Sequence, residues 1–268
     1  MSEPRRRATT RSLMDIVLPI LVFLGAIGLW EAMVRLNDIP PYLLPAPSLI
    51  AQTIVKDWPL LSGSLWVTVK ITFSALLLAI AGGVLLAILF SQWKWVERSF
   101  FPFAVILQVT PIVAIAPLLL VYLDAQNAVL VCAFIVAFFP ILSNTVIGLA
   151  SADRGLVELF QLYRASRWRQ LTLLRLPSAL PYFLGGLKIG GGLALIGAIV
   201  AEIAAGSAGQ GTGLAFRIAE AGYRLNIPRM FAALVLISVT GIAIFLFFSG
   251  LSRLLLGRWH DSERGHET

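Results

Sequence analysis

Residues 65–91 have the sequence LWVTVKITFSALLLAIAGGVLLAILFS, and this stretch decides the class of fold. Its only charged residue is Lys70, and it is longer than the about 20 residues with which a helix crosses a bilayer. A backbone in lipid must satisfy its polar groups within the segment, which a helix does and an isolated strand does not. The stretch therefore predicts a transmembrane helix.

Similar apolar runs recur along the whole chain of 268 residues. They predict about six transmembrane helices, over residues 13–36, 65–91, 100–123, 128–149, 180–204 and 231–256. The composition agrees, because 58% of the residues are hydrophobic and only 13% are charged, against about 25% charged in soluble domains. The sequence does not show the alternating segments of about 10 residues that mark barrel strands. We expect an all-α integral membrane protein with one transmembrane domain over 13–256, between tails at 1–12 and 257–268.

The distribution of positive charge predicts which ends of the helices face the cytoplasm. Arg5, Arg6 and Arg7 precede the first apolar run, and the connection over 153–176 carries another group of arginines. Cytoplasmic segments carry the excess of Lys and Arg in membrane proteins, so both tails and this connection are predicted to be cytoplasmic. The first run continues to Leu36 without a small-residue cleavage site, which favours a retained helix over a signal peptide.

The connection over 153–176 has the pattern of a helix–turn–helix. Its first part has apolar residues at the spacing of one helix face, namely Leu156, Leu159, Phe160 and Tyr163. Ser166 can cap the amino terminus of a second short helix over 167–170. An apolar helix face outside the bilayer has to be buried, either against this protein's own helices or against a cytoplasmic partner, and the pattern leaves both open.

Residues 158–186, ELFQLYRASRWRQLTLLRLPSALPYFLGG, resemble the cytoplasmic "EAA" loop of permeases from binding-protein-dependent ABC importers. Glu158 stands at the glutamate of that motif, and residues 174–177 match its second half. Further stretches resemble the nitrate, sulfonate and taurine branch of these permeases, at 44–48, 110–112, 116–118, 139–141 and 201–202.

Two places in the loop depart from the pattern of that family. Leu159 and Phe160 stand where the motif has alanines, and Arg164 stands where it has a turn glycine. If Arg164 adopts the left-handed conformation, it costs about 1 kcal/mol relative to glycine. We expect the turn to form at that cost.

The resemblance implies a type I ABC importer permease-like fold, with 153–176 as a cytoplasmic coupling loop. It implies a multi-pass protein of the bacterial inner (plasma) membrane that works with a cytoplasmic ABC ATPase dimer, an external solute-binding protein and a second copy of itself. The partner ATPase would bind ATP and Mg, so no cofactor is expected in this chain. The solute would be a small anion such as a sulfonate, nitrate or taurine, or a small heteroaromatic compound or aromatic acid. The residues that the resemblance assigns to ATPase coupling are Glu158, Leu159, Phe160, Tyr163, Arg164, Ala165, Ser166, Arg167, Trp168 and Pro177.

The sequence offers no residues for catalysis within the membrane. Its histidines, His260 and His266, lie in the carboxy-terminal tail, and no P-loop lysine follows the glycines that begin at Gly206. We therefore expect no enzyme activity and no metal site, and we interpret the net charge of +7 as a topology signal rather than a nucleic-acid footprint. The alternative is an ion-coupled secondary transporter that acts without an ATPase, and Glu202 without an evident partner disfavours it.

A further group of residues is predicted to line the translocation path or its gate. Glu202 lies near the outer end of the fifth predicted helix, where a carboxylate is costly unless it is paired or hydrated. Arg217 and Arg224 are the nearest cations in the sequence, although Glu220 lies at ion-pair spacing from both of them. Prolines are expected to kink the third helix, and glycines allow close helix packing at a dimer seam or within one chain. The full set is Glu202, Lys188, Pro111, Pro117, Gly190 and Gly211.

Overall fold

The computed structural model describes residues 5–206 and 212–257, and the chain in these ranges is built of helices. In chain order they are α1 (Arg5–Leu36), α2 (Pro47–Lys56), α3 (Trp58–Gln92), α4 (Lys94–Val109), α5 (Ile112–Tyr122), α6 (Ala125–Ala150), α7 (Arg154–Leu162), α8 (Arg167–Gln170), the π-helical turn η1 (Leu171–Arg175), α9 (Leu176–Ala205), α10 (Leu214–Tyr223) and α11 (Ile227–Leu256).

Five spans of the described chain are long and apolar enough to cross a membrane, and α4 with α5 makes up to six. The five comprise most of α1, all of α3, α6 and α11, and the run Arg167–Ala205 that contains α9. These spans confirm the predicted all-α membrane class with about six transmembrane segments.

The prediction of one kinked helix over 100–123 is wrong, because the chain breaks there and turns. Helices α4 and α5 meet at an angle of 98° across Thr110 and Pro111. Thr110 is extended, with φ −71° and ψ 126°, which is the conformation that a residue before proline favours. Pro111 has no N–H to continue the helix, and the backbone carbonyl of Ile106 accepts from both the N–H and the hydroxyl of Thr110, at 3.1 and 2.6 Å.

Close backbone contacts between α6 and α9 form the centre of the bundle. A Cβ placed on Gly148 of α6 would lie 2.8 Å from the Cα of Ala179 on α9. A Cβ on Gly197 of α9 would lie 2.9 Å from the Cα of Ala133 on α6. Small residues of this kind let membrane helices approach until their backbones touch, which substitutes dispersion contacts for the hydrophobic effect that lipid does not supply.

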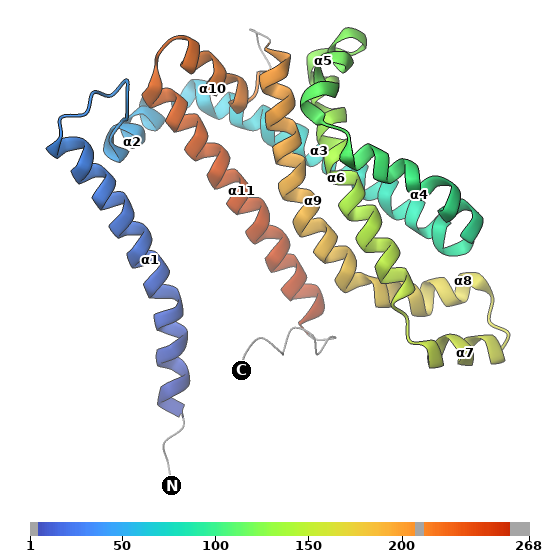
Figure 1. Ribbon diagram of the computed structural model, residues 1–268. Helices are drawn as coiled ribbons and strands as arrows, with labels where there is room; N and C mark the ends of the chain where they lie inside the picture. Colours follow the sequence, from blue (N-terminus) through green and yellow to red (C-terminus); the bar gives the residue numbers. More distant parts are fainter. Residues whose placement is uncertain (1–4, 207–211, 258–268) are drawn as a thin grey trace.

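Helix α1 stands apart from the rest of the bundle (Figure 1). Its carboxy-terminal end is tied to α2 by Glu31, whose carboxylate accepts from the backbone N–H of Ser48 at 3.0 Å and from its hydroxyl at 2.7 Å. This carboxylate caps the first turn of α2, which its own preceding residue Ala46 does not cap.

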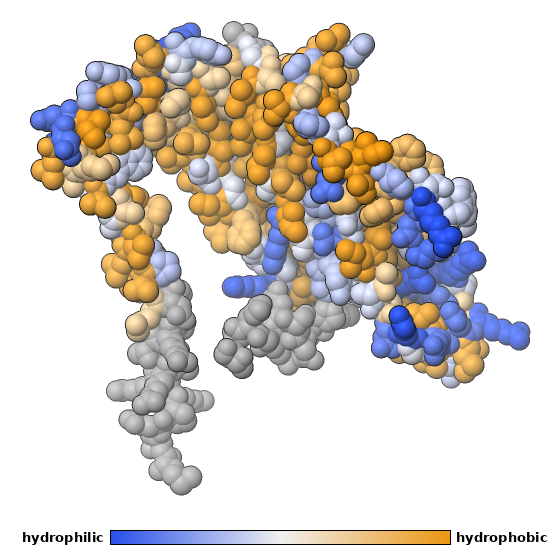
Figure 2. Space-filling view, in the orientation of Figure 1, coloured by the Kyte–Doolittle hydropathy of each residue, from blue (hydrophilic) through white to orange (hydrophobic). Residues whose placement is uncertain are grey.

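The bundle has two distinct ends in Figure 1. Helices α7 and α8 project from the end at which α11 also terminates, and α2, α10 and the tip of α5 lie at the other. Figure 2 shows hydrophilic residues gathered around α7 and α8, while hydrophobic residues cover the bundle above them.

Candidate functional site

The predicted helix–turn–helix is present at the α7–α8 end. Asp153 caps α7 by accepting from the backbone N–H of Leu156 at 3.0 Å, and Ser166 caps α8 by accepting from Arg169 at 3.3 Å. The amino-terminal cap predicted at Ser166 is therefore confirmed. These two caps fix where each short helix begins.

The turn between α7 and α8 has the geometry of a Schellman motif. The backbone N–H of Arg164 donates to the carbonyl of Gln161, and that of Ala165 donates to the carbonyl of Phe160, both at 2.9 Å. Arg164 has φ 51°, so it occupies the left-handed position that glycine usually takes in this motif. The left-handed conformation expected of Arg164 is confirmed.

An exposed apolar surface extends over α7 and α8. Leu156 is 46% exposed, Tyr163 78% and Trp168 68%. We call Leu156, Leu159, Tyr163 and Trp168 the coupling surface. Phe160 lies half-buried beside it, and Glu158 is exposed with no hydrogen bond or ion pair to the described part of the chain. Within the described residues this face is not covered, so the first of the two possibilities, burial against the protein's own helices, does not hold for it.

Two arginines attach the helix–turn–helix to the membrane helices. Arg167 and Arg175 approach the carbonyls of Gln92 and Ser91 at the end of α3, with distances of 3.5 and 3.4 Å. Cations at a helix carboxyl terminus bind its unpaired carbonyls and offset its dipole. Leu171, which lies between these arginines in the sequence, is fully buried. Its burial holds the helix–turn–helix against the membrane helices.

The turn η1 continues this attachment directly into α9. Pro177 lies in the first turn of α9, is exposed, and has no N–H to donate to the carbonyl of Leu173. The chain widens there, so that the N–H of Leu176 donates to Leu171. A π-helical turn of this kind absorbs the missing bond without ending the helix.

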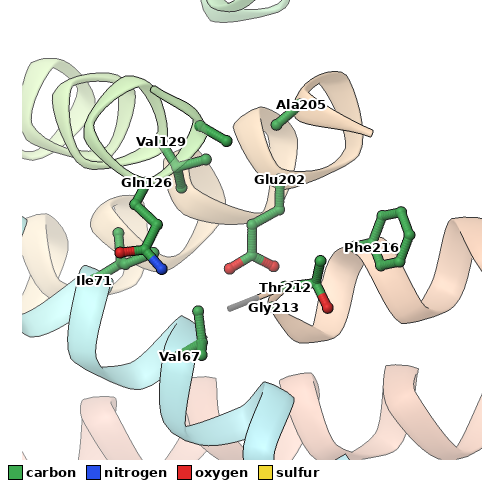
Figure 3. Close-up of a pocket in the computed structure, with 10 residues that line it drawn as sticks. Val67, Ile71, Gln126, Val129, Glu202, Ala205, Thr212, Gly213 and Phe216 are labelled. Carbon is green, nitrogen blue, oxygen red and sulfur yellow. The ribbon is translucent and has the colours of Figure 1, made fainter. Parts of the chain in front are cut away.

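A buried polar cluster lies at the opposite end, around Glu202 (Figure 3). Glu202 of α9 is 5% exposed, and its two carboxylate oxygens have separate donors. The Thr68 hydroxyl of α3 donates to Oε1 at 2.8 Å, and the backbone N–H of Ala215 donates to Oε2 at 3.0 Å. Thr68 also accepts from the backbone N–H of Leu214 at 2.9 Å. The carboxylate is therefore held by hydrogen bonds rather than by a cation.

Gly213 completes this arrangement. A Cβ on Gly213 would fall directly on the carboxylate of Glu202, although its φ of −82° and ψ of −178° suit any residue. Glycine is required here for space and not for backbone conformation. We call Thr68, Glu202 and Gly213, with the amides of Leu214 and Ala215, the outer cluster.

A small cavity adjoins the outer cluster. Figure 3 shows the side chains of Gln126 from α6 and Glu202 from α9 directed toward the same space, with Val67 and Ile71 of α3 on one side. Its volume of about 20 Å³ has room for about one water molecule. The space is too small for an organic solute.

The family assignment follows from comparison with known sequences. The family described as "Binding-protein-dependent transport system inner membrane component" matches residues 79–260. This chain is an ABC importer permease. Its multi-pass helical structure agrees with that assignment.

Individual relatives of the permease cover nearly its whole length. It is 34% identical to the riboflavin transport system permease protein RibX of Chloroflexus aurantiacus, over 91% of this chain and 90% of the relative. It is also 34% identical to the formylaminopyrimidine transport permease protein ThiX of Halalkalibacterium halodurans, over 89% and 94%. The putative aliphatic sulfonates transport permease protein SsuC of Bacillus subtilis is 29% identical, over 93% and 88%.

A solved structure supports the fold independently. The crystal structure of an amino acid ABC transporter with histidines superposes with a TM-score of 0.61, covering 77% of this permease and 97% of that chain. Its sequence identity of 19% restricts the comparison to the fold, and the predicted type I permease fold is confirmed.

Arg217 and Arg224 pair with Glu220, at 2.7 and 3.0 Å, as their spacing in the sequence indicated, and neither of them bonds to Glu202. The hydrogen bond from Arg217 and the charges of both arginines hold the pKa of the Glu220 carboxyl below its usual value. The carboxylate oxygens of Glu202 accept hydrogen bonds from uncharged donors, because the first turn of α10 lies next to the carboxylate and supplies a backbone N–H.

The remaining predicted path residues do not form one site. Gly190 is covered by Ile141 of the same chain, because a Cβ placed on Gly190 would lie 3.0 Å from the Ile141 side chain. This glycine therefore serves close packing between α6 and α9. Lys188 is half-buried in α9. Pro111 and Pro117 are exposed at the α4–α5 turn and within α5. Gly211 lies outside the described residues.

Two members of the outer cluster were not singled out from the sequence. Thr68 lies inside an apolar run, where a threonine is compatible with any buried helix and carries no distinguishing signal. Gly213 ends the glycine-rich stretch 206–213, whose composition predicts a hinge that permits movement rather than a close approach to Glu202. The signal that identifies both is the position of Glu202 in space, far from Thr68 in the sequence.

Proposed function

We propose that this permease forms the solute path of an importer in which a separate cytoplasmic ABC ATPase docks on the coupling surface and hydrolyses ATP. The observation that supports it most is the uncovered apolar face of α7, since leucine and aromatic side chains outside a bilayer need a protein partner. Glu158 lies on the same exposed helix and supplies a charge that a partner can recognise. The chain itself would hold no ATP, Mg or other cofactor.

Matched substitutions on α7 test the docking proposal. Leu156 lies at the centre of the coupling surface, whereas Leu162 is more exposed and lies about 120° around the helix from it. Leu156→Ser and Glu158→Lys should each reduce co-purification of the ATPase and uptake at least tenfold, with normal membrane insertion. Leu162→Ser should leave both close to wild type. Equal behaviour of Leu156→Ser and Leu162→Ser would refute docking through this face.

We propose a homodimer with the translocation path near the subunit interface. Ile196 of α9 is 53% exposed, while the nearby Gly190 is buried within the chain, so a second copy would meet α9 on the Ile196 side. Ile196→Cys should give a symmetric disulfide cross-link in membranes, and Gly190→Cys should not. Absence of any symmetric cross-link along the exposed side of α9 would count against the homodimer.

The substrate that we propose is a small heteroaromatic compound. Two relatives at 34% identity are named for riboflavin and formylaminopyrimidine transport, both nitrogen heterocycles. A sulfonate-like anion is the second candidate, because relatives named for aliphatic sulfonates and taurine share 29% and 24% identity. Calorimetric titration of the cognate solute-binding protein with riboflavin, formylaminopyrimidine, an alkanesulfonate and taurine separates the two classes.

We propose finally that residues 201–229 form the outer gate and part of the surface on which the external binding protein docks. Tyr223 is 91% exposed at the end of α10. The Arg224 side chain beside it pairs with Glu220 but is still 68% exposed, so an acidic partner can reach it. Arg224→Glu should raise the concentration of binding protein needed for half-maximal stimulation of the ATPase. Gly211→Pro should slow uptake if the loop before α10 has to move. Uptake by the permease alone, without the ATPase, would instead support an ion-coupled transporter.

A further inference from the structure

Helix α10 begins without a cap of its own. The first backbone N–H groups of a helix have no acceptor within the helix and usually donate to the side chain of the residue that precedes it. The preceding residue here is Gly213, which has no side chain. The amides of Leu214 and Ala215 are nevertheless both bonded, and both are buried.

The two caps come from two different membrane helices. Leu214 donates to the Thr68 hydroxyl of α3, and Ala215 donates to the Glu202 carboxylate of α9. The same hydroxyl donates to Glu202 at 2.8 Å, so Thr68 uses its donor and an acceptor at once. The start of α10 is thus joined to α3 and α9 by three linked hydrogen bonds in a region from which water is largely excluded, where such bonds are strong.

Beyond its first turn, α10 is held to the bundle mainly by apolar packing, with Ala221 1% exposed, and it makes fewer polar contacts with the membrane helices. Its later turn carries Glu220, whose partners Arg217 and Arg224 lie on α10 or directly after it, so these ion pairs do not attach the helix to the bundle. Arg217 also donates to the Ser64 hydroxyl of α3 at 3.0 Å. Of the polar contacts between α10 and the membrane helices, the outer cluster is the most buried.

We infer that Thr68 and Glu202 are positioning residues that cap α10 from α3 and α9 and so transmit the docking of the external binding protein to the outer ends of these two helices. The inference rests on the proposed docking of that protein on α10. If α10 and the outer ends of α3 and α9 move as one body, a force on the exposed end of α10 shifts the bundle. If the hydrogen bonds of α10 to Thr68 and Glu202 are lost, α10 can tilt without moving α3 and α9. Docking of the binding protein then no longer displaces these two helices.

Helix α3 provides a matched pair of threonines for the test. Thr68 and Thr72 lie one turn apart on the same helix and are both 1% exposed. Thr68 makes two hydrogen bonds in the outer cluster, whereas the Thr72 hydroxyl makes none within the described chain. Replacing either with valine keeps the shape and removes only the hydroxyl, so the difference between the two variants reports the cap.

The assay uses the permease assembled with its ATPase in lipid vesicles and titrated with its purified binding protein. Thr68→Val should raise the concentration of binding protein needed for half-maximal ATPase stimulation about tenfold, as expected for the loss of two hydrogen bonds. Hydrogen exchange at the amides of Leu214 and Ala215 should quicken by a similar factor. Basal ATPase activity should stay unchanged, and Thr72→Val should match wild type in all three measurements.

The outcomes separate this inference from the proposed docking surface. If Arg224→Glu impairs stimulation while Thr68→Val behaves like Thr72→Val, docking on α10 stands and the positioning role is refuted. If Thr68→Val quickens exchange without changing stimulation, the cap is only structural and the inference is also refuted. If Arg224→Glu has no effect on stimulation, docking at this end of α10 fails, and the positioning role fails with it unless Thr68→Val alone impairs stimulation.

Discussion

Replacing Gly213 with alanine should test the geometry of the outer cluster most directly. The new Cβ would occupy the place of the Glu202 carboxylate, so the carboxylate has to move away. It then loses its bonds to Thr68 and to the backbone N–H of Ala215. Overpacking a buried site costs about 1–3 kcal/mol, and each of the two lost hydrogen bonds adds about 1 kcal/mol.

The expected total is a loss of about 3–5 kcal/mol of stability. For a chain of this size such a loss lowers the apparent melting temperature by roughly 6–20 °C, which thermal unfolding of the purified permease in detergent can measure. Gly185→Ala is the matched control, because a Cβ there meets no atom within 4 Å. It should leave stability unchanged or raise it, since alanine favours the helix over glycine.

A double-mutant cycle identifies the cause. In a Glu202→Ala background the carboxylate is gone, so Gly213→Ala should then cost less than about 1 kcal/mol. The large cost in the first background and the small cost in the second together define the contact. If Gly213→Ala costs the same in both backgrounds, or no more than Gly185→Ala, the reasoning from the close approach of Glu202 is refuted.

Three further substitutions follow from the same structure. Arg164→Gly should stabilise the turn after α7 by about 1 kcal/mol, seen as slower hydrogen exchange in α7, and faster exchange would contradict the left-handed turn. Gly148→Ala should destabilise the permease by about 1–3 kcal/mol because the backbone of α9 lies against it, whereas Gly192→Ala, where a Cβ meets nothing within 4 Å, should not. The lowered pKa of Glu220 means that its bonds to Arg217 stabilise α10 fully above the ordinary pKa of about 4.3 and are lost as the pH falls through the lowered value. Exchange in α10 should therefore quicken below about pH 4 in wild type, and a Glu220→Gln variant that keeps the same acid response would exclude this cause.

The sequence predicted those features whose causes are local. The apolar runs predicted five of the membrane helices with ends no more than eight residues from those observed, because the length needed to cross a bilayer is imposed on each segment alone. The same holds for the cap at Ser166 and the left-handed turn at Arg164, which depend on a few neighbouring residues. Prolines at 102, 111 and 117 predicted an irregular third span but not its angle, because a kink and a break differ only in how the flanking helices pack.

The outer cluster was beyond such reasoning for a physical reason. The choice of partner for Glu202 depends on which donors α3 and α10 bring to it, and neither position is encoded near residue 202. The sequence indicated only that a carboxylate at this depth has to be paired or hydrated, and it offered Arg217 and Arg224 as the nearest cations without assigning either to Glu202. Two hydrogen bonds from neutral groups satisfy the carboxylate instead, and the arginines are satisfied by Glu220.

Helices α3 and α9 connect the two ends of the permease. At one end of α3 the carbonyls of Ser91 and Gln92 are bound by arginines of the coupling loop, and nearer its other end Thr68 caps α10. Helix α9 begins directly after the turn that carries Arg175 and ends with Glu202 in the outer cluster. A helix of 35 residues such as α3 is roughly 50 Å long, and its backbone bonds resist changes in length. A displacement of residues 153–176 would therefore move both helices at the point where α10 is attached. An ATPase and a binding protein that dock as proposed above would act on the same two helices.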